Sequence, residues 1–144
     1  MQLSIIIPAK NEAASIGEVV GRIRSDFPKA EIIVVDDGST DRTAALAEER
    51  GAKVVSHPQS LGNGAAVKAG ARAATGEILV FLDADGQHDP ADIPRLLEKL
   101  DEGYDMVVGA RSSSSPTGSK RRAIVISSFD WKLAELRPKE AATP

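Results

Sequence analysis

Two aspartates one residue apart, Asp83 and Asp85, are the residues of this chain best suited to chemistry. They follow the apolar run Ile78–Leu82, which predicts a buried strand. In extended backbone, side chains at i and i+2 point the same way, so both carboxylates can face one cation. Such oxygen ligands suit Mg²⁺ or Mn²⁺ carrying a substrate phosphate. An acidic turn that ends the strand is the alternative, because turns also favour Asp and Gly.

Other polar clusters also follow predicted strands. Residues 8–12 follow a strand over 3–7, residues 36–39 follow a strand over 32–35, and Arg111 comes after a short strand over 106–108. Ligands of parallel sheets bind outside the carboxyl ends of the strands. We therefore expect these acidic and amide groups to converge on one rim of the sheet.

Strand and helix signals alternate along the chain up to Arg111. Near-continuous β-branched strands between amphipathic helices predict an α/β fold, with a Rossmann-like, mostly parallel sheet covered by helices on both faces. Besides the strands above, the patterns predict a strand over 52–55 and helices over 14–27, 41–50, 64–74 and 90–100.

The character of the chain changes after Arg111. The Ser-rich residues 112–119 are typical of a linker, and Lys120–Arg122 form a basic cluster. Residues 123–136 show weak periodicity, for which we expect one helix before a polar end. The predicted organisation is one domain over residues 1–111, followed by a segment over 112–144.

Composition excludes several classes of protein. The chain has 144 residues, which suits one domain, and its net charge of −3 argues against nucleic-acid binding through a basic surface. It has no cysteine and 2 histidines, which excludes disulfides, Cys-based zinc sites and multi-histidine metal sites. No apolar run approaches the roughly 18 residues of a membrane span, and no secretory signal is recognisable. We expect a cytoplasmic protein, with peripheral contact at a membrane surface left open.

Several polar residues have two readings. Asn11 and Glu12 either cap the first helix or line a ligand site. Asp36 leaves its strand first and is our choice for hydrogen bonds to a base or ribose, although a turn would also explain it. Asp41 fits a first-turn acid that complements a helix dipole.

The glycine-rich entry to the third helix, residues 61–68, does not match known phosphate-binding motifs. Val67 stands where a dinucleotide fingerprint has its third glycine, and no Gly-Lys-Ser/Thr is present. Close helix packing and a backbone that can approach a ligand explain it better. Lys68 is either a phosphate contact or a solvated helix residue.

The sequence does not fit two common kinds of hydrolytic active site. Neither His57 nor His88 has a Ser or Cys partner in a recognisable nucleophile setting, so a catalytic triad is not expected. Haloacid-dehalogenase phosphatases carry an Asp-x-Asp triplet after the first strand, whereas Asp83–Asp85 follow the fourth predicted strand.

Four motifs in order carry a resemblance to a known family. They are Ile5–Glu12, Val34–Asp41, Gly62–Ala66 and Phe81–Gln87. This series resembles family 2 glycosyltransferases of the GT-A fold, over residues 1 to about 111. The branch it looks most similar to is the dolichyl- and polyprenyl-phosphate mannosyl- or glucosyltransferases.

The resemblance implies a divalent cation, Mg²⁺ or Mn²⁺, and a nucleotide-sugar donor. It implies that Asp83, Asp85 and Gln87 hold the cation, and that Asp85 and Arg111 act at the reacting phosphates. The residues expected to bind the nucleotide sugar are Pro8, Ala9, Asn11, Glu12, Asp36, Lys68, Asp83 and Ala84.

The reaction implied is an inverting transfer of a hexose from a UDP- or GDP-sugar to a polyprenyl phosphate. The acceptor's own anionic oxygen can attack, so no protein base is required; an alcohol acceptor would need one. Members of this branch continue well beyond the present length, in a region that carries acceptor contacts. Lys120–Arg122 are either what remains of an acceptor-phosphate site or a solvated basic patch. The alternative function is a truncated, non-catalytic nucleotide-sugar-binding module completed by a partner or by a homodimer. A nucleotidyltransferase is a third reading, without a glycine-rich triphosphate loop to support it.

Overall fold

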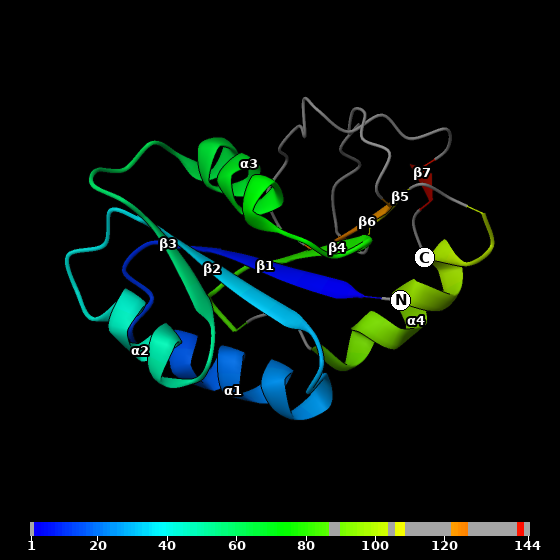
Figure 1. Ribbon diagram of the computed structural model, residues 1–144, viewed down its shortest axis with the longest axis horizontal. Helices are drawn as coiled ribbons and strands as arrows, with labels where there is room; N and C mark the ends of the chain where they lie inside the picture. The colour runs from blue at the N-terminus through cyan, green and yellow to red at the C-terminus, as the bar shows by residue number, and fades with distance from the viewer. Residues whose placement is uncertain (1, 87–89, 104–105, 109–121, 127–140, 143–144) are drawn as a thin grey trace.

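Strands and helices alternate in the computed structural model, which describes residues 2–86, 90–103, 106–108, 122–126 and 141–142 (Figure 1). The elements are β1 (Leu3–Ala9), α1 (Ile16–Asp26), β2 (Glu31–Asp37), α2 (Thr43–Glu49), β3 (Lys53–His57), α3 (Asn63–Ala73), β4 (Ile78–Leu82), the 3₁₀ turn η1 (Pro90–Asp92), α4 (Ile93–Leu100), β5 (Met106–Val108), β6 (Arg122–Ile126) and β7 (Ala141–Ala142).

The described strands form one sheet in the order β3-β2-β1-β4-β6-β5-β7, and every pair is parallel. The chain runs from β1 outward through β2 to β3, and then crosses back so that β4 lies on the other side of β1. The predicted α/β class and parallel sheet are therefore confirmed.

Helices cover both faces of the sheet. Figure 1 shows α3 above the sheet and α1, α2 and α4 below it. Alternate residues of the strands feed two apolar cores: Ile5 and Ile7 point toward the α1 side, whereas Ile6 packs with Val67 of α3. Burial on both faces explains why these strands read as continuous apolar runs rather than alternating ones.

The prediction of a helix over residues 123–136 is wrong for its first part. Residues Arg122–Ile126 form strand β6, which pairs with β4 on one side and β5 on the other. The β-branched run Ile124–Ile126 suits a strand paired on both edges, and this tertiary pairing outweighs a weak helical periodicity. The rest of the predicted helix lies outside the described residues.

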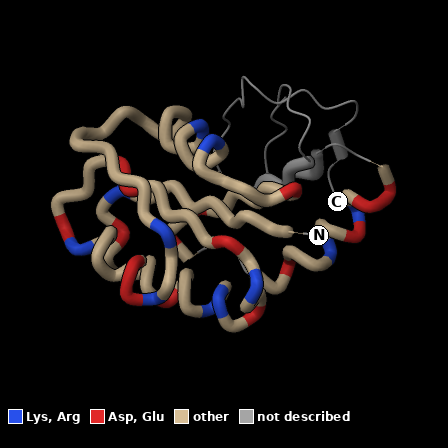
Figure 2. Tube along the Cα trace, in the orientation of Figure 1, with Lys and Arg blue, Asp and Glu red and all other residues tan. Residues whose placement is uncertain are grey.

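Charged residues gather in the helices and loops rather than in the strands. Figure 2 shows basic and acidic residues interspersed along the helices below the sheet. Within the described residues, no helix has the length and apolar character needed to cross a membrane.

The carboxylate of Glu31, a partly buried residue whose side chain is 8% exposed, joins three segments at the amino-terminal edge of the sheet. Its oxygens accept hydrogen bonds from Ser4 Oγ at 2.7 Å, Thr75 N at 2.8 Å and Lys53 Nζ at 2.7 Å. Burial alone would raise the pKa of Glu31, but the hydrogen bonds from Lys53, Thr75 and Ser4 outweigh it and lower the pKa to about 2. Glu31 therefore stabilises the fold in its ionised form.

We expect the contribution of Glu31 to stability to depend on pH. Its pKa is 4.5 in the unfolded chain and about 2 in the fold, so the contribution is complete above pH 4.5 and is lost as the pH falls toward 2. The lowering of the pKa from 4.5 to about 2 corresponds to about 3 kcal/mol at neutral pH. Urea unfolding of wild type and Glu31→Gln at several pH values measures it. A difference between the two proteins that stays constant from pH 7 to pH 3 would contradict this prediction.

Candidate functional site

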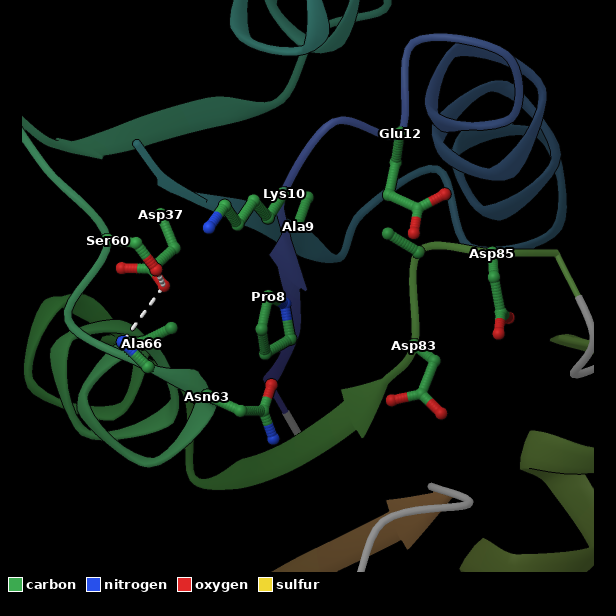
Figure 3. A pocket seen from close by; sticks show the side chains of 12 residues that line it. Pro8, Ala9, Lys10, Glu12, Asp37, Ser60, Asn63, Ala66, Asp83 and Asp85 are labelled. Atoms are coloured by element: carbon green, nitrogen blue, oxygen red, sulfur yellow. Dashed lines mark hydrogen bonds between the residues drawn. The ribbon is translucent and has the colours of Figure 1, made fainter. Parts of the chain in front are cut away.

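A pocket of about 260 Å³ opens at the carboxyl-terminal edge of the sheet. Its volume lies just below the range of roughly 300–1,000 Å³ that is usual for small-ligand sites. Figure 3 shows side chains from several elements facing it. The lining residues are Pro8, Ala9, Lys10, Glu12, Asp37, Ser60, Gly62, Asn63, Ala66, Asp83, Ala84 and Asp85.

The pocket lies where the order of the strands reverses. The chain leaves β1 toward β2 on one side, and α3 then brings it back to β4 on the other side of β1. The loops after β1 and β4 therefore diverge and leave a crevice between them, which is where open α/β sheets bind ligands. Strands β1 and β2 run two residues further than predicted, so Pro8, Ala9 and Asp37 end these strands rather than follow them. Together with Asp83 and Asp85 after β4, they line this pocket, in agreement with the predicted convergence on one rim.

Asp83 and Asp85 both line the pocket, although their backbone is not the extended one expected. The β4 strand ends at Leu82, and Ala84 and Asp85 lie in a turn. Figure 3 shows the two carboxylates leaving the chain on the same side. The triplet is thus both a turn and a pair of carboxylates at one pocket, so the two readings of the sequence are compatible.

Ser15, just before α1, ties the acidic triplet to the loop after β1. Its hydroxyl lies 2.6 Å from the carbonyl oxygen of Ala84 and 3.3 Å from Oε2 of Glu12. The hydroxyl has one proton, which the nearer oxygen, that of Ala84, accepts. Ser15 therefore links the main chain between the two aspartates to the start of α1.

Asn11 holds the loop after β1 against the loop after β2. Its φ of 53° lies in the left-handed region, which Asn tolerates better than most residues. Asn11 Oδ1 accepts a hydrogen bond from Thr40 N at 2.8 Å, and Ser39 Oγ accepts one from Asn11 N at 2.9 Å. The side chain of Asn11 thus neither caps α1 nor lines the pocket.

Asp41 strengthens the same junction. Its carboxylate accepts hydrogen bonds from the hydroxyl and the amide of Thr43, at the start of α2, and from Ala13 N. The hydrogen bond from the Thr43 side chain is the largest cause of a lowered pKa for Asp41. The prediction of a first-turn acid is not confirmed, because α2 begins at Thr43 and its first turn holds no acidic residue. Asp41 lies just before the helix and instead accepts hydrogen bonds from Thr43, its first residue.

The two aspartates at the end of β2 point to opposite faces of the sheet. Asp36 is buried, accepts a hydrogen bond from Ser39 N at 3.0 Å and does not line the pocket. Asp37 does line it, from the side covered by α3. Burial would raise the pKa of Asp37, but hydrogen bonds, led by that from Leu61 N, lower it to about 2.

The residues expected to bind ligand are only partly brought together. Asn11, Asp36 and Lys68 do not line the pocket, and Gln87 and Arg111 lie outside the described residues. The expected residues that do line it are Pro8, Ala9, Glu12, Asp83, Ala84 and Asp85.

Sequence reasoning overlooked several lining residues. Lys10 lies within the motif Ile5–Glu12, but the motif points to Pro8, Ala9, Asn11 and Glu12 rather than to this lysine. Asn63 stands between Gly62 and Gly64, whose backbone can approach a ligand, and this position between two glycines is the local signal for its place in the pocket. Ser60 had no signal in the sequence, because its place depends on a contact with Asp37.

The charges of the pocket favour a cation together with an anionic ligand. Four carboxylates and one lysine line it. A diphosphate alone would be repelled by this balance, whereas a divalent cation offsets both sets of negative charge. No group of three or more His, Cys, Asp or Glu side chains able to hold a metal ion occurs within the described residues. The paired aspartates fit Mg²⁺ or Mn²⁺ as partial ligands, with phosphate oxygens and water completing the shell.

Comparison with protein families gives an independent result. The model described as glycosyl transferase family 2 matches residues 4–139. The chain is 38% identical over 135 residues to undecaprenyl-phosphate 4-deoxy-4-formamido-L-arabinose transferase of Enterobacter sp. (strain 638), covering 85% of this chain and 40% of that protein. It is 41% identical over 109 residues to an uncharacterised glycosyltransferase of Mycobacterium bovis, covering 76% of this chain and 48% of that protein. The chain thus spans less than half the length of these relatives.

Solved structures with the same fold include ligand complexes. Glucosyl-3-phosphoglycerate synthase from Mycobacterium tuberculosis, in complex with Mn²⁺, UDP-glucose and phosphoglyceric acid, superposes with a TM-score of 0.65. It is 35% identical, and the match covers 76% of this chain and 43% of that one. Mannosyl-3-phosphoglycerate synthase from Rubrobacter xylanophilus has a TM-score of 0.66 at 24% identity, with 77% of this chain and 40% of that one covered, and shows the fold alone.

Proposed function

Because the chain belongs to glycosyltransferase family 2, we propose that its pocket binds the nucleoside diphosphate part of a nucleotide sugar with a divalent cation. We further propose that the protein transfers the hexose to a polyprenyl phosphate with inversion at the anomeric carbon. A UDP-sugar is the favoured donor, since a similar structure contains UDP-glucose and Mn²⁺.

One observation carries the proposal. Asp83 and Asp85 line the same pocket as Pro8 and Ala9, at the point where the strand order reverses. This arrangement supports the proposal, because carboxylate oxygens suit a hard cation and the adjacent main chain of Pro8 and Ala9 offers a surface for a nucleotide. Asp83 and Asp85 are assigned to the cation, and Pro8, Ala9, Glu12 and Ala84 to the nucleotide sugar.

The chemistry requires little of the protein beyond position and charge. An oxygen of the acceptor phosphate bonds to the anomeric carbon as the bond from that carbon to the diphosphate breaks. The nucleoside diphosphate leaves with the bonding electrons. A divalent cation held by Asp83 and Asp85 would supply positive charge to stabilise it. Asp83 and Asp85 orient that end of the donor. The acceptor oxygen is already anionic, so none of the pocket carboxylates has to remove a proton.

The acceptor is proposed from the relatives. The Enterobacter relative is named as a transferase that uses undecaprenyl phosphate, whereas the mycobacterial structure contains phosphoglyceric acid. A lipid phosphate is favoured because its attack needs no protein base, and the described pocket offers carboxylates but no histidine. Gln87 and Arg111 remain candidates for the cation and the phosphates.

A transfer assay tests the proposal. The protein is incubated with radiolabelled UDP-glucose or GDP-mannose, Mn²⁺ or Mg²⁺, and a short polyprenyl phosphate, with phosphoglyceric acid as the alternative acceptor. The expected result is label in the lipid fraction that requires the cation. Donor binding without transfer to either acceptor would contradict the transferase and favour a binding module completed by a partner or a second copy. Pyrophosphate release from a nucleoside triphosphate would favour a nucleotidyltransferase instead.

A further inference from the structure

Strand β2 carries at each end a carboxylate whose side chain is largely covered, 8% exposed for Glu31 and 7% for Asp37. Glu31 begins the strand at the edge of the sheet away from the pocket, and Asp37 ends it at the pocket. Both have pKa values lowered to about 2 by hydrogen bonds that outweigh the effect of burial. The two residues are thus alike in burial and charge and differ in what they hold.

The oxygens of Asp37 accept hydrogen bonds from β3 and the loop that follows it. The donors are His57 Nδ1 at 2.9 Å, Ser60 Oγ at 2.8 Å, Leu61 N at 2.8 Å and Gly62 N at 3.0 Å. Since an ionised carboxylate only accepts hydrogen bonds, Nδ1 of His57 carries the proton. Asp37 is 5% exposed, so it is suited to holding this loop rather than to contacting a ligand.

The groups that Asp37 holds form one wall of the pocket. Ser60 and Gly62 line the pocket directly, and Gly62 immediately precedes α3, whose Asn63 and Ala66 also line it. The dashed lines in Figure 3 mark hydrogen bonds between Asp37 and this wall.

The turn after Asp37 also lies directly against the loop. Gly38 has a φ of 74°, and a Cβ added to it would lie 2.6 Å from Ser60 N. Only glycine therefore fits this approach without a shift of the loop. Residues 60–62 are therefore held in position in two ways, by the close packing of Gly38 and by the hydrogen bonds to Asp37.

We propose that Asp37 is a positioning residue that holds residues 60–62 and the start of α3 as the wall of the donor pocket. The proposal rests on the function proposed above, because it concerns binding at the same pocket. It assigns Asp37 no contact with the reacting atoms. Loss of the Asp37 charge should release this wall and weaken donor binding. The weakening should exceed that caused by an equally destabilising substitution away from the pocket.

The matched variants Asp37→Asn and Glu31→Gln test this proposal. Urea unfolding should show both variants to be less stable than wild type, because each loses a buried, hydrogen-bonded charge. Calorimetric titration with UDP and Mn²⁺ should show binding weakened about tenfold in Asp37→Asn and unchanged in Glu31→Gln. Unchanged UDP affinity in Asp37→Asn, or equal weakening in Glu31→Gln, would overturn the proposal.

A second variant covers the case in which Asp37→Asn does not fold. His57→Leu removes one donor to Asp37 without changing a residue that lines the pocket. It should weaken UDP binding in Mn²⁺ by about threefold, in keeping with the loss of one hydrogen bond. An affinity equal to that of wild type would count against the positioning role.

Amide hydrogen exchange separates this proposal from the proposed function. If wild type binds no UDP in Mn²⁺, the proposed function fails, and the wall is then tested by the exchange rates of the Leu61 and Gly62 amides. These amides should exchange faster in Asp37→Asn, or in His57→Leu, and at the wild-type rate in Glu31→Gln. Equal exchange in wild type and the Asp37 or His57 variant would overturn the positioning role.

Discussion

Replacing Asp85 with alanine is expected to weaken binding of UDP in the presence of Mn²⁺ by about 100-fold or more. Asp85 lines the pocket beside Asp83, and the pair supplies the carboxylate oxygens proposed to hold the cation. Loss of residues that merely orient metal ligands costs about 10- to 100-fold, so loss of a ligand should lie at or beyond that range. Without the cation, the acidic pocket repels the diphosphate. Titration calorimetry with and without Mn²⁺ measures the effect.

The control for this variant is Asp26→Ala. Asp26 is also an exposed aspartate, but it ends α1 away from the pocket. Its replacement removes the same charge and should leave UDP affinity unchanged. Chelation of the metal by EDTA should reduce binding in wild type to the level of Asp85→Ala. An unaltered Mn²⁺ dependence in Asp85→Ala would remove Asp85 from the cation site.

Replacing Gly70 with alanine should produce the largest loss of stability among the changes considered for α3. A Cβ at Gly70 would lie 2.3 Å from Cγ2 of Ile6 and 3.1 Å from Cγ2 of Val35, and both side chains are fully buried. The helix would have to move away from β1 and β2, at a cost of about 1–3 kcal/mol. Alanine regains up to about 1 kcal/mol in helix propensity, which is less than most of the range given for the cost of moving the helix. Urea unfolding measures the net change.

Gly64→Ala is the matched control in the same helix. Gly64 is exposed, and an added Cβ there meets no atom within 4 Å. Its replacement should therefore raise the free energy of unfolding, by up to about 1 kcal/mol. The two substitutions are chemically identical and are expected to act in opposite directions. Stabilisation of the protein by Gly70→Ala would show that α3 does not pack on the sheet as closely as described.

Local sequence predicted the layered arrangement because each signal depends on neighbours along the chain. Runs such as Ile32–Val35 require burial on both faces, and this requirement implies parallel strands between helices. Residues 122–126 show the limit of such signals. Their run of β-branched residues fits a strand, but the pairing with β4 and β5 that makes it one joins segments far apart in sequence.

The candidate site was predictable where a residue stands directly after a strand. Asp83 and Asp85 follow β4, whereas Pro8 and Ala9, predicted to follow the first strand, are its last two residues; all four line the pocket. The choice between Asp36 and Asp37 was not predictable in this way. Adjacent residues at the end of a strand point to opposite faces, and the face that bears the pocket depends on the course of α3.

The sequence by itself determined the order of the elements, the parallel sheet and the presence of carboxylates at its carboxyl-terminal edge. These properties follow from periodicity and from the residue types that end strands. Only the tertiary structure decided which polar groups face the pocket and which hold loops together. Asn11 and Asp37 read alike as rim residues, but their oxygens accept hydrogen bonds from segments more than 20 positions away. Such contacts arise when the chain folds back on itself, and no local pattern records them.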